Sequence, residues 1–599
     1  MEGIPNPGSQ NPGLPPLPQF RRLLPFVRPY ARKLSLVFLL TVFSSLIGLV
    51  YPLGARFLID NVLGARNLHL LVGVTFALAG IVVLGFVLSA LTRYLYTLVS
   101  ARILMDMRLS LFRHLQNLSP RFFAKTKTGE ILSRLSSDVS EIQSLATDGV
   151  FSLALSLLTL VGTVGIQLYL NWKLFLLCTF FLPLSGHLLV RFRQRIAGQA
   201  RIVRERNAEV SSTLVESLQG MKWIRTVGAE GAEADKLKEK NEDYVAALLG
   251  YQVVSAYANA LPLAFLSLST LVLLLYGGNQ VIAGRMSLGS LVAFAAYQAR
   301  VLSPVQNIIG LYLSVQRARV SLNRVFEFFD LQPEVREREN AFRLSPPRSK
   351  IEFCDVSFAY QSGEPVLKSI NLRIPEGSRV AIVGPSGAGK STLVDLLLRF
   401  YDPQQGMVMF AGQDLKDVQL SSLRESFAVI SAEPFLFHAS IEENLRYANP
   451  RASEEDVWAA ARMADLEEFI RGLPDGMASV VGERGLKLST GQRQRMAIAR
   501  AALRDARVWV FDEATGALDV LTESHIWTAL EKCLAGRTTL TISHRLSSVR
   551  GASQIFVLDR GEIVQQGSHA GLVGEAGLYQ RLYQAAGLPG ISGVEPRWT

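Results

Sequence analysis

The residues of this 599-residue chain that are best suited to chemistry lie in one glycine-rich stretch, Gly384–Ser391, of sequence GPSGAGKS. A glycine, four free positions and then Gly-Lys-Ser is the pattern of a phosphate-binding loop, and every fixed position is kept. Glycines let backbone N–H groups close around phosphate oxygens, and a following helix adds the positive end of its dipole. The spacing therefore predicts a nucleotide site in which Lys390 meets the β- and γ-phosphates and Ser391 ligates magnesium.

Such a loop needs a strand before it and a helix after it, and the sequence supplies both. The run 379–383 is short and apolar, as in a buried strand, and 392–398 has the apolar face of a helix. We expect the phosphates to be held by the loop and by the start of this helix. The residues concerned are Gly384, Ser386, Gly387, Gly389, Lys390, Ser391 and Thr392.

A second strand is predicted to bring acids to the same site. The apolar run 508–511 ends in Asp512 and Glu513. Asp512 is suited to holding magnesium, and Glu513 to activating the attacking water. An apolar run ending in two acids is a weak signal alone, but downstream of a phosphate loop it indicates ATP hydrolysis. The predicted cofactors are ATP and Mg²⁺.

The first half of the chain has the composition of a membrane protein. The whole sequence is 49% hydrophobic and only 19% charged, and 70–91, 150–170 and 253–281 contain no charge. Each of these stretches is long enough to cross a bilayer. We expect six spans, at about Leu34–Leu58, Leu70–Leu91, Val150–Leu170, Leu174–Val190, Val253–Tyr276 and Met286–Gln316.

The positive charges indicate the orientation of these spans. The two long connections, 92–149 and 191–252, contain 8 and 11 Lys and Arg residues, whereas the three short ones contain one each. Because positive loops stay in the cytoplasm, the long connections, the N-terminus and the second half are predicted to be cytoplasmic. Apolar residues in the two long connections recur at helical spacing, which predicts that the spans continue past the bilayer as helices. The positive charge is largely accounted for by these flanks, so no nucleic-acid partner is expected.

One charge, Arg300, falls near the middle of the sixth predicted span, where it is costly unless it faces protein or water. Tyr297, Arg300 and Asn307 share one helical face by their spacing. A polar stripe along a substrate cavity and a structural hydrogen bond between helices both account for this face. If Arg300 faces a cavity, it favours a substrate with an anionic or polar head group and an apolar body.

Several motifs of the chain resemble those of ATP-binding-cassette (ABC) transporters. Leu488–Arg495, of sequence LSTGQRQR, is similar to their signature sequence, and Val481–Gly485 to a stretch typical of exporters. Ile542–Arg545 resembles the segment with their switch histidine, and Phe122–Asp138 their first cytoplasmic coupling region. The resemblance covers nearly everything from Phe20 to about Ala585. It points to the type IV half-transporter exporters, in which six spans precede one ATPase domain.

The resemblance implies a dimer in which the phosphate loop of one chain and the signature of the other enclose ATP. It implies that Tyr360 stacks on adenine and that His544 orients the γ-phosphate. It also implies that the signature contacts the partner's nucleotide through Ser489, Gly491 and Gln492. The second chain is expected to be another copy, with a heterodimer left open. The other expected partners are membrane lipids and a small amphipathic substrate.

The fold class implied is an all-α six-helix transmembrane domain with long cytoplasmic helical extensions, followed by an α/β P-loop ATPase domain. The predicted parts are a disordered N-terminus at 1–20, the transmembrane domain at 21–328, a linker at 329–349, the nucleotide-binding domain at 350–585 and a flexible tail at 586–599. The expected location is a bacterial inner membrane, crossed several times, with the ATPase domain in the cytoplasm.

Three positions depart from the family pattern. Ala432 stands where the family has a glutamine that touches magnesium and the attacking water, Thr490 replaces a signature glycine, and Gly516 replaces a serine. By analogy with lost outer ligands of metal sites, Ala432 predicts a rate penalty of about 10–100-fold. The altered signature beside retained Glu513 and His544 also fits the catalytic half of a heterodimer.

The function that follows is an ATP-hydrolysing exporter that moves a lipid-like or amphipathic compound outward by alternating access. Ala432 motivates one alternative, an ATP-binding membrane regulator or channel with weak hydrolysis. Retained Glu513 argues against that alternative, because a chain that only binds ATP has no need of a residue that activates water.

Overall fold

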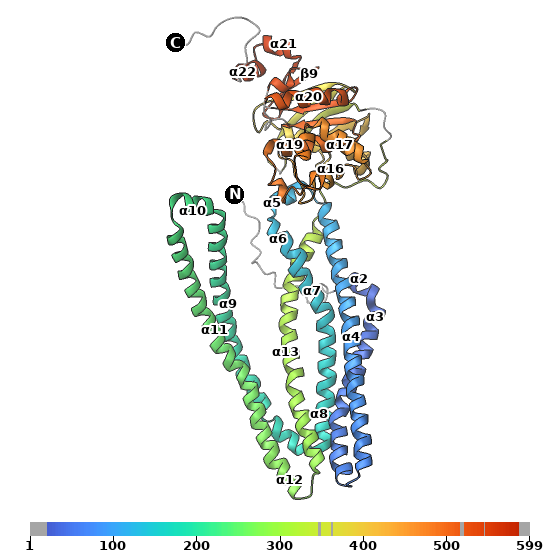
Figure 1. The fold of residues 1–599 in the computed structure, drawn as a ribbon, viewed down its shortest axis with the longest axis vertical. Coiled ribbons are helices and arrows are strands. Elements are labelled where there is room, and N and C mark those ends of the chain that lie inside the picture. The colour runs from blue at the N-terminus through green and yellow to red at the C-terminus, as the bar shows by residue number, and fades with distance from the viewer. Residues whose placement is uncertain (1–20, 345–348, 361–362, 515–519, 544–545, 586–599) are drawn as a thin grey trace. The chain divides into compact units, whose positions relative to one another are not determined.

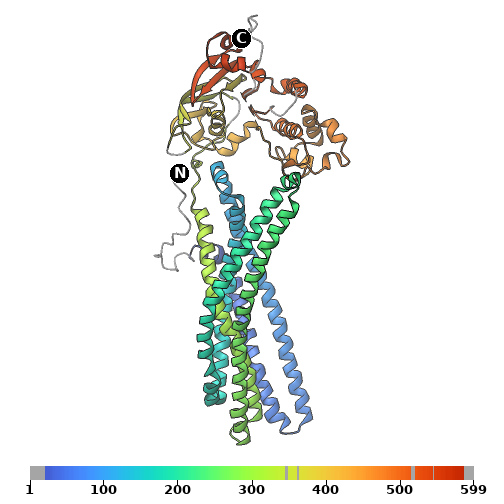
Figure 2. The ribbon, with the colours of Figure 1, turned by 90° about the vertical axis from the view of Figure 1, so that its left-hand side faces the viewer.

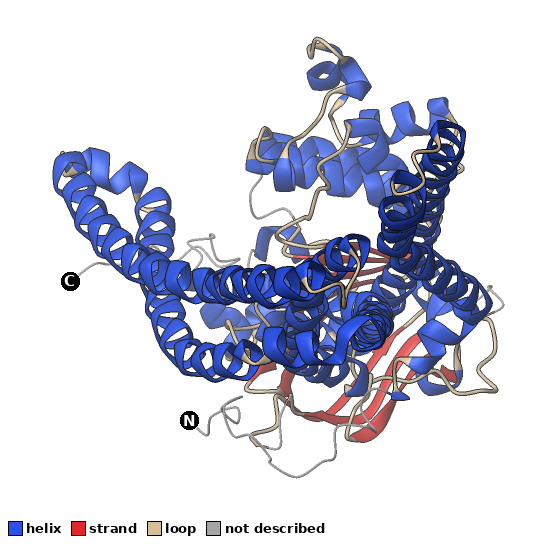
Figure 3. Cartoon of the chain, turned by 90° about the horizontal axis from the view of Figure 1, so that it is seen from below, coloured by secondary structure: helices blue, strands red, loops and turns tan. Residues whose placement is uncertain are grey.

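The computed structural model describes residues 21–344, 349–360, 363–514, 520–543 and 546–585. The chain divides into two compact units. The first comprises the described residues up to Gln116 together with Lys127–Leu331, and the second comprises Asn117–Thr126 and the described residues from Gln332 onward. Both β-sheets belong to the second unit. Figure 3 shows their strands in red. The predicted fold class, a helical membrane domain followed by an α/β domain, is confirmed.

The first unit consists of long helices, as a membrane requires, because every backbone N–H group within a bilayer must be paired inside its own segment (Figure 1). In chain order its elements are α2 (Leu24–Val27), η1 (Arg28–Tyr30), α3 (Ala31–Phe57), η2 (Leu58–Leu63), α4 (Leu68–Gln116), α6 (Thr128–Ser133), η3 (Arg134–Asp138), α7 (Val139–Ser144), η4 (Leu145–Gly149), α8 (Val150–Thr179), α9 (Phe181–Gln219), α10 (Met221–Val227), α11 (Glu230–Val272), η5 (Leu273–Gly277), α12 (Gly278–Ile282) and α13 (Leu288–Asp330).

Four stretches of the described residues are long and apolar enough to cross a membrane: Leu24–Leu63, Leu68–Gln116, Thr128–Thr179 and Glu230–Ile282. The third stretch contains a break at Asn171, where φ is −166° and ψ is 100° and where Oδ1 accepts a hydrogen bond of 3.0 Å from the Leu174 amide. This break separates the third predicted span from the fourth. The sixth predicted span lies on α13, which carries Arg300 and is not one of the four. The number of six spans therefore stays a prediction.

The long charged connections are helical, as predicted. α4 continues to Gln116, and α9, α10 and α11 cover almost all of 191–252. α9 and α11 run side by side (Figures 1 and 2). Two ion pairs join them: Lys240 Nζ lies 3.1 Å from Glu209 Oε2, and Arg206 Nη1 lies 3.7 Å from Asp243 Oδ2. Ion pairs of this kind add to helix propensity in stabilising the two helices.

The second unit contains a four-stranded antiparallel sheet of order β2-β1-β4-β5 and a six-stranded sheet of order β10-β9-β3-β8-β7-β6. The strands are β1 (Ile351–Phe358), β2 (Leu367–Ile374), β3 (Arg379–Val383), β4 (Gln405–Phe410), β5 (Gln413–Asp414), β6 (Phe427–Ile430), β7 (Val508–Asp512), β8 (Thr538–Ile542), β9 (Gln554–Asp559) and β10 (Glu562–Gly567). The helices are α5 (Pro120–Lys125), α14 (Lys390–Leu397), η6 (Leu415–Asp417), α15 (Leu420–Glu425), α16 (Ile441–Arg446), α17 (Glu454–Met463), α18 (Glu467–Arg471), η7 (Gly476–Ala478), η8 (Glu483–Gly485), α19 (Thr490–Ala502), α20 (Val520–Leu534), η9 (Leu546–Val549), α21 (His569–Gly574) and α22 (Leu578–Ala585).

The short helix α5 belongs to the second unit although the chain before and after it belongs to the first. Arg121 of α5 lies 3.8 Å from Glu334, and its backbone lies within hydrogen-bonding reach of the Tyr401 hydroxyl. The first part of the segment that resembles a cytoplasmic coupling region, up to Thr126, thus belongs to the α/β unit.

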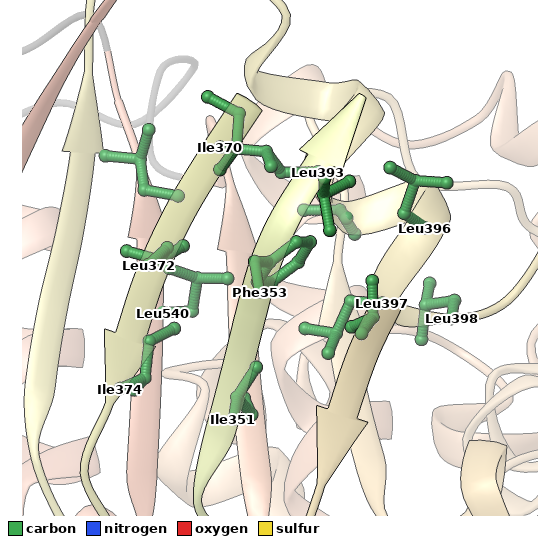
Figure 4. Close-up of a cluster of buried hydrophobic side chains, with 14 of the residues drawn as sticks. Ile351, Phe353, Ile370, Leu372, Ile374, Leu393, Leu396, Leu397, Leu398 and Leu540 are labelled. Carbon is green, nitrogen blue, oxygen red and sulfur yellow. The ribbon is translucent and has the colours of Figure 1, made fainter. Parts of the chain in front are cut away.

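A buried apolar cluster fixes helix α14 on the sheets. Phe353 of β1 and Ile370 of β2 lie in one cluster with Leu393 and Leu397 of α14 and Leu540 of β8 (Figure 4). Each of these side chains is at most 3% exposed, and burying such a side chain stabilises a fold by about 1.5–3 kcal/mol. The cluster therefore holds the helix that begins at Lys390.

A buried cation ties the chain after α14 to the segment that enters the second unit. The Arg399 side chain is 2% exposed, and its guanidinium donates to the backbone oxygens of Leu415 and Arg336, each at 3.0 Å. It also pairs with Asp402 at 3.0 Å. Because the buried Leu415 carbonyl would be left without a donor, Arg399 is a structural residue that a small apolar side chain cannot replace.

We expect Arg399→Ala to destabilise the protein by about 3 kcal/mol, since it leaves the partly exposed Asp402 carboxylate and two backbone carbonyls without their donor. In a thermal-unfolding measurement on the purified full chain, this corresponds to a midpoint lower by roughly 10 °C. The matched control is Arg373→Ala: Arg373 pairs with Glu352, but its side chain is 69% exposed, so the midpoint should stay within about 2 °C. Equal shifts for the two variants would contradict the role of Arg399.

Candidate nucleotide-hydrolysis site

The predicted site residues gather at the carboxyl ends of three adjacent parallel strands. In the six-stranded sheet, β8 lies between β3 and β7, and Ile542 of β8 is level with Ile382 of β3 and with Asp512 of β7. The glycine loop begins directly after β3. Carboxyl ends of parallel strands form the binding edge of open α/β sheets, and this register brings the loop and the acids to the same edge.

The glycine loop has a backbone that other residues could not adopt. At Gly384 φ is +159°, and a Cβ atom there would lie 2.0 Å from the backbone oxygen of Leu558. At Gly389 φ is +103°, and a Cβ atom would lie 2.8 Å from Leu367 Cδ2. No side chain caps α14, so its first N–H groups remain available to an anion. The exposed members of the loop are Ser386, Gly387 and Ser391.

Lys390 is buried, and its Nζ donates to the backbone oxygens of Gly384 and Pro385 at 3.0 and 2.8 Å. Burial lowers the pKa of Lys390, while the carboxylates of Glu513 and Asp512 act in the opposite direction. The ammonium group is therefore held inside the curve of the loop with two acids within electrostatic range. A bound phosphate would add the negative charge that favours its protonated form.

The two acids follow β7 in different conformations. Asp512 is the last residue of the strand, whereas Glu513 has φ of +53° and donates its N–H to the Ile542 oxygen at 2.9 Å. A left-handed conformation at a non-glycine residue costs about 1–3 kcal/mol and is common where function fixes a side chain. The backbone therefore turns at Glu513, directly after the end of β7, and does not continue in the direction of the strand.

The donor set fits a magnesium–nucleotide complex better than a metal bound by protein alone. Among the described residues, no group of three or more His, Cys, Asp and Glu could hold a metal ion. The exposed Ser391 hydroxyl and the Asp512 carboxylate are hard oxygen ligands. Mg²⁺ usually takes one or two protein ligands of this kind and fills its other positions with phosphate and water.

Tyr360 lies beside the start of α14. Its hydroxyl is 3.0 Å from Thr392 Oγ1 and donates to Asp395 Oδ2 at 3.1 Å, and its ring meets Tyr401 edge-on with centroids 5.3 Å apart. Burial raises the pKa of Tyr360 to about 12 and also raises the pKa of Asp395. The neutral, half-buried ring is thus anchored to α14. Stacking on adenine stays a prediction.

The signature residues cap their own helix, which the sequence did not lead us to expect. Ser489 precedes α19: its N–H donates to Gln492 Oε1 at 2.8 Å, and its Oγ accepts from the Gln492 amide at 3.2 Å. Arg493 donates to the hydroxyl of exposed Thr490 at 3.1 Å. Gly491 is half-buried in the first turn. The substituted position therefore has a partner within its own helix.

Gln494 contacts the loop that carries Ala432, and the sequence patterns did not single it out. It is fully buried, and its Nε2 donates to the Ser431 oxygen at 3.2 Å, next to exposed Ala432. Within the described part of the chain, its Oε1 has no partner. The sequence signal that could have revealed Gln494 is a polar residue on the apolar face of α19. Its hydrogen bond to Ser431 joins the signature helix α19 to the loop that follows β6.

The remaining predicted residues are dispersed. His544 and Gly516 lie outside the described residues. In the first unit, half-buried Arg300 lines a cavity of about 640 Å³ and donates to the Gly48 oxygen. Tyr297 is fully buried and donates to the Leu49 oxygen, and Asn307 is exposed. The structure thus brings Arg300 to a cavity, but does not place Tyr297 or Asn307 among its lining residues.

Comparisons with known proteins agree with both units. Residues 34–305 match the family model described as ABC transporter transmembrane region, and 367–516 match the model described as ABC transporter. An ATP-dependent lipid A-core flippase of Syntrophus aciditrophicus is 34% identical, over 94% of either chain. The putative multidrug export ATP-binding/permease protein YgaD of Bacillus subtilis is 33% identical, over 94% of this chain and 98% of its own. A solved bacterial Atm1-family ABC exporter with ATP bound has a TM-score of 0.76 at 27% identity, covering 94% of this chain and 99% of its own.

We expect Ala432→Gln to raise the rate of ATP hydrolysis by about 10-fold, because the exposed loop position regains an amide that can reach magnesium and water. Phosphate release by the purified chain in lipid nanodiscs measures this rate. Ala432→Leu is the matched control, since it adds a side chain of similar size without the amide, and it should leave the rate within about twofold. Equal rates of ATP hydrolysis for the two variants would contradict the hypothesis that the wild-type site lacks an amide ligand at position 432.

Proposed function

The chain belongs to the ABC transporter family as an exporter-type half-transporter with an ATPase coupled to transport, and on this premise we propose that it moves a lipid-like or amphipathic compound outward across a bacterial inner membrane by alternating access. The observation that carries the proposal is the arrangement of Lys390, Asp512 and Glu513 at one edge of the sheet. This arrangement supports hydrolysis, whereas a chain that only binds ATP would not require Glu513.

Each residue has a role that follows from its position. Lys390 and the first turn of α14 bind the phosphates, and Ser391 and Asp512 hold Mg²⁺, which neutralises charge on the phosphate oxygens when bound. Glu513 orients the attacking water and accepts its proton. Tyr360 positions the base. His544 is proposed to orient the γ-phosphate on the strength of the family pattern alone.

The surface of the first unit supports a location within lipid. Large apolar side chains on α4 point outward: Phe76 is 75% exposed and Phe86 74%. In water such a surface would favour aggregation, whereas in a bilayer it faces acyl chains at no cost. The cytoplasmic orientation proposed for the ATPase domain rests on the Lys and Arg residues of the long connections.

We expect Glu513→Gln to lower phosphate release by at least about 100-fold, because the amide cannot accept the proton of water. ATP binding, measured with a fluorescent analogue, should stay within about threefold, since the phosphate contacts are untouched. Glu562→Gln on exposed strand β10 is the control and should leave phosphate release unchanged. Wild-type protein that binds ATP without measurable phosphate release would instead favour the regulator alternative.

Half-transporters of this family act as dimers, and we propose that this chain pairs with a second copy of itself. The altered signature is compatible with a homodimer, because Ser489 and Gln492 still form the helix cap and the Thr490 hydroxyl is held by Arg493. The residue that differs from the family pattern therefore lies in a capped first turn of α19.

Expressed alone, the chain should elute as a dimer of twice 65.9 kDa, after correction for detergent, and should hydrolyse ATP. Light scattering coupled to size exclusion gives the mass. A mixture of chains carrying Lys390→Ala with chains carrying Ser489→Arg provides the sharper test, because each mixed dimer keeps one intact site. Activity restored by mixing supports the homodimer, and a monomer or an inactive dimer would indicate a second gene product as partner.

A further inference from the structure

The membrane unit contains a cavity whose chemistry is more specific than an apolar pore. It has a volume of about 640 Å³ and lies among α3, α4, α8 and α13. Its apolar walls include Leu49, Phe151 and Leu155, and many of the remaining lining residues carry hydroxyl groups. Two arginines, Arg93 and Arg300, line it, and no Asp or Glu is among its described lining residues.

Arg300 reaches the cavity from α13 with much of its hydrogen-bonding capacity unused. Its Nη1 donates to the backbone oxygen of Gly48 on α3. A guanidinium carries five N–H donors, and the described structure assigns Arg300 this one bond. A cation near the middle of a span is costly without an opposing charge. A ligand that brings negative charge would therefore be bound with a large electrostatic gain.

The wall around the arginines is polar and partly unsatisfied. Thr92, next to Arg93 on α4, is a lining residue whose hydroxyl is buried, and it has no partner among the described residues. The hydroxyls of Ser45 and Thr159 form a hydrogen bond with each other at 3.1 Å, which leaves one of the two protons to donate elsewhere. Such hydroxyls can donate to anionic oxygens while the arginines supply charge.

We propose that this cavity binds the anionic, phosphate-like head group of an amphipathic substrate through Arg93 and Arg300. The inference rests on the proposed export function and narrows its substrate class. Guanidinium groups bind phosphate through paired N–H donors, and the adjoining apolar wall accommodates the start of an acyl chain. A cationic amphiphile of the same shape is disfavoured, because it would add a like charge beside two arginines.

The test uses the full chain in phosphatidylcholine nanodiscs and three probes that separate charge from chain. Oleoyl lysophosphatidic acid carries the anion and the chain, oleoyl lysophosphatidylcholine carries the same chain on a zwitterion, and glycerol 3-phosphate carries the anion alone. Dissociation constants are measured directly, together with stimulation of phosphate release. Lysophosphatidic acid should bind at least about 10-fold more tightly than either of the others.

Arg300→Gln and Arg93→Gln should each weaken lysophosphatidic acid binding by about 10-fold, and Arg300→Lys should recover part of the loss. Lysophosphatidylcholine binding should not change. Arg285→Gln, in the exposed turn before α13, is the matched control and should behave as wild type. Because the two variants lie on different helices, misfolding of one leaves the other as a test.

Equal affinity for the two lysolipids, or an unchanged dissociation constant in both Gln variants, would overturn the inference even if phosphate release still depends on Glu513. Glycerol 3-phosphate that binds as tightly as lysophosphatidic acid would overturn the role of the apolar wall. Selective lysophosphatidic acid binding without any phosphate release would leave the cavity assignment in place and overturn the proposed function instead. The two proposals therefore fail separately.

Discussion

The candidate hydrolysis site is organised around the buried ammonium group of Lys390. Lys390 is held by two carbonyl oxygens of its own loop, at 3.0 and 2.8 Å, within electrostatic range of Asp512 and Glu513. Burying an ammonium is expensive, so the loop, the strand that precedes it and the acid-bearing strand must all be placed accurately for the arrangement to persist. The glycine positions, the parallel register and the core beneath α14 can each be understood as meeting this requirement.

The surrounding structure offsets the cost of that arrangement. The apolar cluster on β1 and β2 fixes α14, and Arg399 fastens the chain after it through backbone oxygens far away in sequence. Glu513 keeps a left-handed conformation because its N–H is paired with Ile542. A frame that holds the left-handed Glu513 in one conformation is what preorganised electrostatic catalysis requires.

Local patterns predicted the parts of the fold that are set locally. The glycine loop, strand 379–383 and the helical extensions follow from spacing within a few residues. The hydrogen bonds from Gln494 to Ser431 and from Arg399 to Arg336 join residues more than 60 apart in sequence, and no local pattern encodes them. The stripe on α13 stays a prediction: Arg300 lines the cavity, whereas Asn307, which shares its face, lies seven residues and about 10 Å further along the helix and is not among the lining residues.

The capping role of the signature does not prevent it from binding a nucleotide. The Ser489 oxygen accepts the Gln492 amide, but a hydroxyl still has its own proton to donate. The cap fixes the Ser489 oxygen at the start of α19. Only the hydroxyl hydrogen can still rotate, and the accepted hydrogen bond restricts its directions. Thr490 is bulkier than the glycine of the family pattern. Because Arg493 donates a hydrogen bond to its hydroxyl, the Thr490 side chain is held against α19. In the proposed dimer, the signature would therefore be a donor preorganised by its own helix, to which the partner chain brings the phosphate.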